Sequence, residues 1–104
     1  MPARILQLNF KFDLTPAEYE AAVSPLAGDF AEVPGLQWKV WLMNEPEREA
    51  GGIYVFDDQV SLDAYLEGEL AGAVMAHPAL SDFEAKQFDV MDVPTVITRG
   101  PVGV

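Results

Sequence analysis

The stretch PGLQWKVWLMNEPEREAGGIYVF, residues 34–56, decides how this chain folds. It opens with a Pro-Gly turn, after which two apolar runs, 36–43 and 51–56, flank a polar connection centred on Pro46. Such a pattern is typical of two strands paired as a β-hairpin. Both tryptophans, Trp38 and Trp41, lie in the first run. They are three residues apart, so a regular strand places them on opposite faces of the sheet.

The segments around this hairpin predict two more strands and two helices. Residues 5–12 alternate apolar and polar side chains, and a final strand is predicted over 84–91. A helix is predicted from Pro16, with a capping box at its start and a kink at Pro25. A second helix follows Asp58 and ends at His77-Pro78; we expect its two glycines to weaken its later half.

The element order βαββαβ predicts an α+β fold of ferredoxin-like type over residues 1–104, with 92–104 as a C-terminal tail. This fold has an antiparallel four-stranded sheet with helices on one face only. The uncovered face would carry Trp41, Lys39 and Ile53 among other apolar and polar residues. It is too apolar to remain in water, so we expect a homodimer in which two sheets pack face to face.

Composition excludes several classes of function. The formal net charge of −11 opposes binding to nucleic acids and to anionic membranes. The chain has no cysteine, so disulfides, thiol nucleophiles and thiolate metal sites are excluded. No apolar run approaches the length of a membrane span, and no signal-peptide pattern is present. A cytoplasmic protein is the expectation.

Motifs for the common catalytic and cofactor sites are also missing. One histidine with scattered carboxylates does not match a metal-site spacing, and no metal is predicted. Gly51-Gly52 precedes a strand, so it indicates a bulge or a close backbone approach and not a phosphate loop. His77 is the only histidine, hence a candidate base; the simpler interpretation is an exposed residue at a helix end.

An unusual supply of aromatic side chains is predicted for the helix-facing side of the sheet. Most of the phenylalanines fit an ordinary core, whereas Trp38, Tyr54 and Tyr65 carry polar atoms that need partners when buried. A cavity lined in this way would suit a flat aromatic ligand. The residues expected to share this space are Phe10, Phe12, Tyr19, Trp38, Tyr54 or Phe56, Tyr65 and Phe88.

The chain resembles the YdhR-type monooxygenases. The resemblance is carried by PG-x-x-WKVW from Pro34, by EAGGIY-x-F up to Phe56 and by AYLE at 64–67. It extends over nearly the whole chain, except for residues 69–81 and a loosely similar tail. The family belongs to the dimeric α+β barrels, which include the antibiotic-biosynthesis monooxygenases. It implies a homodimer that oxidises a hydroxylated aromatic or polycyclic molecule with dioxygen, without a metal, flavin or haem cofactor.

The resemblance suggests roles for individual residues. Tyr54 and His77 become candidate catalytic residues. Asn9, Trp41 and Tyr65 are second-rank candidates for the pocket, after Trp38 and Tyr54. Asn9 and Trp41 fall on the face opposite Phe10 and Trp38 in regular strands, so the candidates cannot all line one pocket. The residues proposed to contact the substrate are Trp38, Phe10, Tyr65, Phe56, Phe88 and Asn9.

Two other functions stay open at this point. Haem binding or degradation would use an asparagine, an aromatic residue and a histidine, for which Asn9, Tyr65 and His77 are a faint match. A module that sequesters a hydrophobic small molecule without reaction would need the same pocket.

Overall fold

The computed structural model describes residues 3–102 as one four-stranded sheet with helices. Its order along the chain is βαββαβ, followed by a short helix within the predicted tail. The strands are β1 (Arg4–Phe12), β2 (Leu36–Asn44), β3 (Glu49–Phe56) and β4 (Leu80–Asp89). The helices are α1 (Pro16–Val23), α2 (Ala27–Ala31), α3 (Gln59–Glu67), α4 (Glu69–Met75) and α5 (Asp92–Ile97), with 3-10 turns η1 (Ser24–Leu26) and η2 (Glu45–Glu47).

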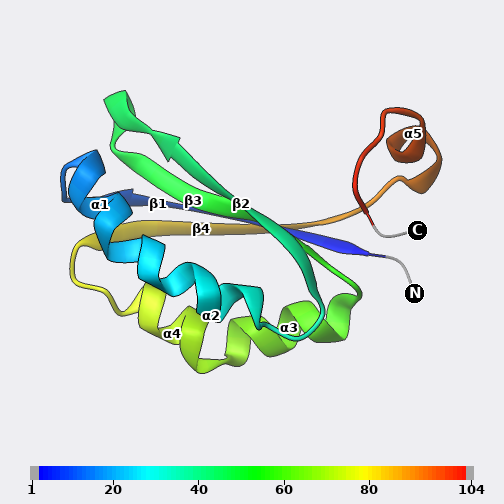
Figure 1. Cartoon of the computed structure of the whole chain (residues 1–104), viewed down its shortest axis with the longest axis horizontal. Coiled ribbons are helices and arrows are strands. Elements are labelled where there is room, and N and C mark those ends of the chain that lie inside the picture. The colour runs from blue at the N-terminus through cyan, green and yellow to red at the C-terminus, as the bar shows by residue number, and fades with distance from the viewer. Residues whose placement is uncertain (1–2, 103–104) are drawn as a thin grey trace.

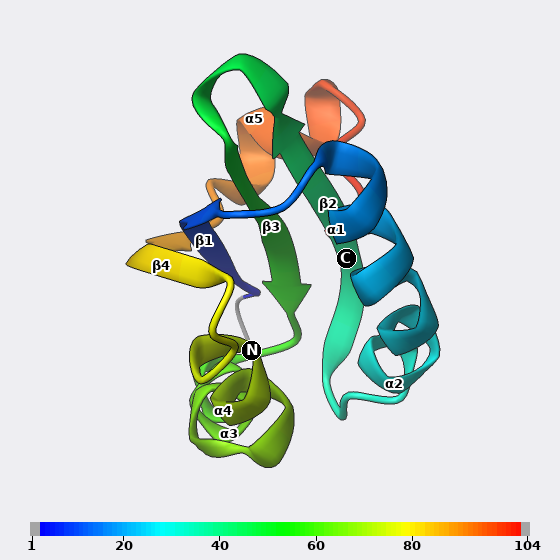
Figure 2. The ribbon, with the colours of Figure 1, turned by 90° about the vertical axis from the view of Figure 1, so that its left-hand side faces the viewer.

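The sheet has the strand order β2-β3-β1-β4, and every neighbouring pair is antiparallel. Helices α1 to α4 lie on one side of it, and α5 lies on the other side, beyond the end of β4 (Figure 1). Figure 2 views the molecule from one end, with α1 and α2 beside β2 and with α3 and α4 below the sheet. The predicted ferredoxin-like α+β fold is therefore confirmed.

The helix boundaries follow the predicted signals. Thr15 and Glu18 form both hydrogen bonds of a capping box at the start of α1. Pro25 lies in η1, where the predicted kink becomes a 3-10 turn that separates α1 from α2. Gly68 ends α3 and begins α4, so the second helix breaks at the first of its glycines.

The faces of β2 differ from the expectation because β2 contains a β-bulge. Leu36 pairs with Phe56 but Trp38 pairs with Val55, which leaves Gln37 as an extra residue. One extra residue turns every later side chain to the other face. Lys39 is therefore beside Tyr54 on the helix-covered face, and Trp38 is on the opposite face. The predicted faces of Trp38, Lys39 and Trp41 were wrong for this reason.

Strand β4 begins four residues earlier than expected, and this changes which phenylalanine enters the core. A second bulge lies in β4 between the partners of Asn9 and Lys11, where Asp82 has a positive φ of 55°. Phe83 then packs against Phe10, with ring centroids 5.3 Å apart. Phe88 instead pairs with Ile5 on the opposite face and is 45% exposed, so its predicted place in the pocket was wrong.

Gly51 allows β1 and β3 to approach closely. Its φ is +154°, and a Cβ atom there would lie 1.9 Å from the carbonyl oxygen of Leu8. Only glycine fits such a contact, because the obstructing atom belongs to backbone. The predicted close backbone approach at Gly51-Gly52 is thus confirmed.

The face away from α1 to α4 is partly covered by the tail. The indole N–H of Trp38 donates a hydrogen bond to the carbonyl of Pro101, and Val102 is buried. Val55 beside Trp38 is also fully buried. Further along this face, Val40 is 48% exposed, so the tail covers only one part of it.

Candidate active site

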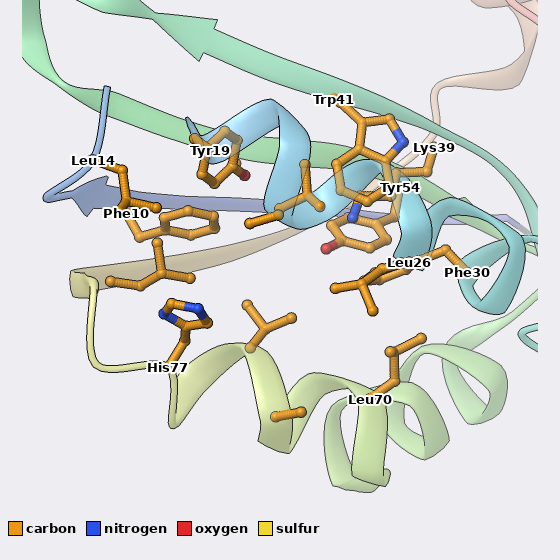
Figure 3. A pocket seen from close by; sticks show the side chains of 16 residues that line it. Phe10, Leu14, Tyr19, Leu26, Phe30, Lys39, Trp41, Tyr54, Leu70 and His77 are labelled. Atoms are coloured by element: carbon orange, nitrogen blue, oxygen red, sulfur yellow. The ribbon is translucent and has the colours of Figure 1, made fainter. Parts of the chain in front are cut away.

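A cavity of about 160 Å³ lies between the sheet and helices α1, α2 and α4 (Figure 3). A void of about 150 Å³ can hold a benzene ring, so this one accommodates a single aromatic ring. Its polar groups come from Tyr19, Lys39, Tyr54 and His77. The rest of the lining is apolar or aromatic, formed by Phe10, Leu14, Ala22, Val23, Leu26, Phe30, Trp41, Gly51, Leu70, Ala73, Val74 and Leu80.

A second, open depression adjoins this cavity. It has a volume of about 430 Å³ and lies between α1, Ala27 and the end of β2 that carries Trp41, Leu42 and Met43. Tyr19, Val23 and Trp41 border both spaces. The two spaces therefore share part of their walls.

Lys39 is the cation of the cavity. Its Nζ lies 3.5 Å from the ring centroid of Phe30, 3.4 Å from that of Trp41 and 4.6 Å from that of Tyr54. Burial lowers the pKa of Lys39 from 10.5 to about 7. Gly52 makes room for the chain of this lysine, because a Cβ atom there would lie 2.8 Å from Lys39 Cε.

Two buried tyrosines form a hydrogen-bonded pair behind the cavity. The hydroxyl oxygens of Tyr54 and Tyr65 are 3.1 Å apart. Burial raises the pKa of both tyrosines, and that of Tyr19 to about 12, so all three stay neutral at physiological pH. Tyr54 lines the cavity whereas Tyr65 does not, so Tyr65 can orient the Tyr54 hydroxyl from behind.

His77 follows the end of α4 and points into the cavity across from Lys39 and Tyr54 (Figure 3). Its Nδ1 accepts a hydrogen bond from the backbone N–H of Ala79, at 3.1 Å. In the neutral ring the proton is then on Nε2. The neutral imidazole therefore carries a hydrogen-bond donor at its free nitrogen and has no free lone pair with which to act as a base.

The structure brings together some of the predicted site residues and separates others. Phe10, Tyr54 and His77 line the cavity, and Tyr65 contacts it through Tyr54. Phe56 is fully buried in the core outside the lining. The residues on the opposite face of the sheet are Asn9, Trp38, Ile53 and Phe88.

Lys39 and Trp41 are the site residues whose place was not foreseen. Both were assigned to the dimer face, but both line the cavity. The Gln37 bulge decides this, and no local sequence signal marks it. The one available hint was Gly52, because a glycine paired opposite Trp41 leaves space for large side chains on the same face.

Residues 3–102 contain neither a metal-binding cluster nor a membrane-spanning helix. Within residues 3–102 no cluster of three or more histidine or carboxylate side chains is placed to hold a metal ion. In the same range no helix has the length and apolar character needed to cross a membrane.

Solved structures of several other proteins share this fold. SnoaB from Streptomyces nogalater, a cofactor-independent oxygenase, superimposes with a TM-score of 0.71 at 22% identity, covering 89% of this chain and 97% of SnoaB. A protein from Caulobacter crescentus, described as a putative antibiotic biosynthesis monooxygenase, gives a TM-score of 0.71 at 14% identity, covering 88% and 92%. The haem degrader MhuD from Mycobacterium tuberculosis gives a TM-score of 0.65 at 16% identity, covering 84% and 95%.

Comparison of the sequence itself decides the family. No curated protein sequence matches the chain. The family model described as "Putative mono-oxygenase ydhR" matches residues 5–101, nearly the whole length. The expected resemblance is thereby confirmed, and the chain belongs to the YdhR monooxygenase family.

Proposed function

We propose that this protein is a cofactor-independent monooxygenase that oxidises a hydroxylated aromatic or polycyclic molecule. The observation that carries this proposal is the inner cavity, which fits one aromatic ring and shares part of its wall with a larger open depression. Its walls are aromatic and aliphatic, and its few polar groups are a lysine, two neutral phenols and an imidazole. Membership of a monooxygenase family supports the same reaction class.

In the proposed reaction the substrate itself supplies the electrons. An ionised hydroxyarene transfers one electron to dioxygen, which gives an aryloxyl radical and superoxide. These two combine on a ring carbon to form a peroxide anion, which takes up the proton that the substrate released and becomes a hydroperoxide. Loss of water then leaves a quinone. The ring loses two hydrogen atoms and gains one oxygen atom, while the second oxygen atom leaves as water. A dry cavity protects these intermediates from solvent.

The neutral donors of the cavity have distinct roles in this proposal. The Tyr54 hydroxyl, oriented by Tyr65, donates a hydrogen bond to the oxygen that carries negative charge. Nε2–H of His77 lies across the cavity and donates to the developing hydroperoxide. Trp41 and Phe30 contact each other edge to face and form one aromatic wall against which the flat ring lies.

The proposed active form is a homodimer that associates through the uncovered sheet face. Val40 and Phe88 there are 48% and 45% exposed, and Ile53 lies between Val40 and Gln7. Exposed apolar residues on α5, with Val93 and Ile97 more than 70% exposed, border this face and extend it. Analytical ultracentrifugation tests the dimer: Val40→Glu should give monomers, and an unchanged mass would contradict this interface.

Oxygen uptake by metal-free protein tests the proposed reaction. The substrates are a panel of anthrones and polycyclic hydroquinones, supplied with ¹⁸O₂, and the products are analysed by mass spectrometry. The proposal predicts one ¹⁸O atom in each product molecule and one in water. Ligand binding without oxygen uptake would instead support a module that sequesters hydrophobic molecules.

The haem alternative has a separate and inexpensive test. Asn9 lies on the opposite face of the sheet from the cavity, so the three residues considered for haem do not converge. We expect no Soret shift when hemin is added to the purified protein. A stoichiometric Soret shift that is lost in His77→Ala would favour haem binding over the oxygenase.

A further inference from the structure

The Lys39 amine is the cationic group of the cavity, and the roles above leave it unused. We propose that Lys39 is the base of the reaction, and that it selects substrates with an acidic phenolic or enolic hydroxyl. This inference rests on the proposed oxygenase function and adds the group that ionises the substrate.

The position of the amine is the first argument. Nζ lies 3.4 to 4.6 Å from the centroids of three aromatic rings, at the border of the cavity. No hydrogen-bond acceptor and no carboxylate within residues 3–102 contacts it. The hydrogen-bonding capacity of the amine is therefore open to a ligand in the cavity.

The surrounding charges are the second argument. The titratable groups that face the cavity are Tyr19 on α1, Tyr54 on β3 and His77 after α4, while Glu20 borders only the outer depression. The tyrosines are neutral because burial raises the pKa of each. With no anion nearby, a buried lysine tends to lose its proton, and its pKa falls to about 7. Near neutral pH the amine therefore exists in both forms.

A base of this kind can complete the first step without any other reagent. The neutral amine takes the proton of the substrate hydroxyl: the O–H bond breaks, an N–H bond forms, and the electron pair stays on oxygen. The resulting ammonium then lies beside the oxyanion and between aromatic faces that attract a cation. A hydroxyl much less acidic than the ammonium would remain protonated, so an acidic hydroxyl is selected.

The amine can be tested in the unmodified protein without turnover. The chain contains three lysines, so ¹³Cε chemical shifts can follow each one against pH, with Lys39→Arg identifying the signal of Lys39. We expect Lys39 to titrate near pH 7 in the folded protein and near 10.5 once urea has unfolded it. Titration of Lys39 near 10.5 in the folded protein would overturn the proposal.

Ligand binding provides the second readout. 4-Nitrophenol absorbs in the visible only as its anion, and 4-nitroanisole has the same ring without an ionisable proton. We expect protein-bound nitrophenol to keep its anion band about one pH unit or more below the free compound. Bound nitrophenol should also raise the pH midpoint of the Lys39 titration, because an amine that favours the phenolate is itself favoured in its protonated form by the phenolate. Nitroanisole should leave that midpoint unchanged.

Variants separate this proposal from the oxygenase proposal. Lys39→Met should lose the anion band, and Lys86→Met should keep it. Lys39→Arg should keep the band but lower the oxygenase kcat tenfold or more, because arginine stays protonated. A band that persists in Lys39→Met would overturn the role of Lys39. A Lys39-dependent band with no oxygen uptake by any substrate would overturn the oxygenase and leave Lys39 as an anion-binding base.

Discussion

The two faces of the sheet carry similar residues, but one face lines a cavity and the other packs against the tail. The helix-covered face places Trp41, Lys39 and Tyr54 around a cavity, whereas the opposite face places Trp38 and Val55 under the docked tail. Composition does not distinguish the faces, since each has one tryptophan and a row of apolar side chains. The single extra residue of the bulge distinguishes them, because it decides which tryptophan faces the cavity.

The arrangement of both faces depends first on the contact between β1 and β3. Gly51→Val places a side chain against the Leu8 carbonyl, so we expect it to lower the free energy of unfolding by about 3 kcal/mol or more. Gly72→Ala is the matched control, since a Cβ atom there meets nothing within 4 Å. It should raise the free energy of unfolding by about 0.5 to 1 kcal/mol. Urea denaturation measures the free energy of unfolding of both variants. Equal changes in the two would contradict the close contact between β1 and β3 at Gly51.

Deletion of Gln37 tests the bulge itself. Without this residue Leu36 and Trp38 become neighbours in a regular strand, and their pairing with Phe56 and Val55 keeps every later side chain on its present face. We therefore expect the Lys39 midpoint to stay near 7. Lysine ¹³Cε titration measures this midpoint. A variant that folds with Lys39 titrating near 10.5 would contradict the assignment of Gln37 as the extra residue.

The pH dependence of protein stability tests whether the folded state lowers the pKa of Lys39. The unfolded lysine titrates near 10.5 and the folded one near 7, so between these values the unfolded chain binds more protons. The free energy of unfolding of the wild type therefore gains from Lys39 as pH rises through this window. Below about pH 7 the buried ammonium lowers the free energy of unfolding most. Lys39→Met removes the buried charge. It should be more stable than the wild type by about 1 to 2 kcal/mol near pH 6, a figure reduced for partial exposure.

Urea denaturation at several pH values checks this prediction. The stability difference between Lys39→Met and the wild type should shrink as pH approaches 10.5. Lys86→Met should follow the wild type throughout, because Lys86 is exposed on the other face. A constant difference across the window would mean that the amine titrates as an ordinary lysine.

A smaller effect is expected at the tyrosine pair. Tyr65→Phe removes the partner of the buried Tyr54 hydroxyl, which should cost about 1 kcal/mol of stability. It should also lower the oxygenase kcat several-fold with little change in KM, because the Tyr54 donor loses its orientation. Thermal denaturation and steady-state kinetics measure the two effects; a changed KM with normal kcat would indicate a packing role only.

The fold was predictable because its signals are local. Alternation in β1, the capping box at Thr15 and the proline in η1 each appear in consecutive residues. The site was only partly predictable. Tyr54 and Phe10 were placed correctly on the helix side, since their strands are regular up to those positions.

The main error came from the bulge in β2. This bulge arises from pairing with the neighbouring strand β3, and it leaves no mark in its own segment. It moved Trp38 out of the cavity and brought in Lys39 and Trp41. The chemistry therefore depended on a register that the sequence alone does not specify.

The most direct test of the central claim compares the two tryptophans in one assay. Oxygen uptake with the best substrate is measured for Trp41→Phe and Trp38→Phe under the same conditions. Trp41 lines the cavity, so its variant should lose at least about tenfold in kcat/KM. Trp38 contacts the tail, so its variant should stay within about twofold of the wild type. A larger loss in Trp38→Phe than in Trp41→Phe would contradict a reaction on the helix-covered face.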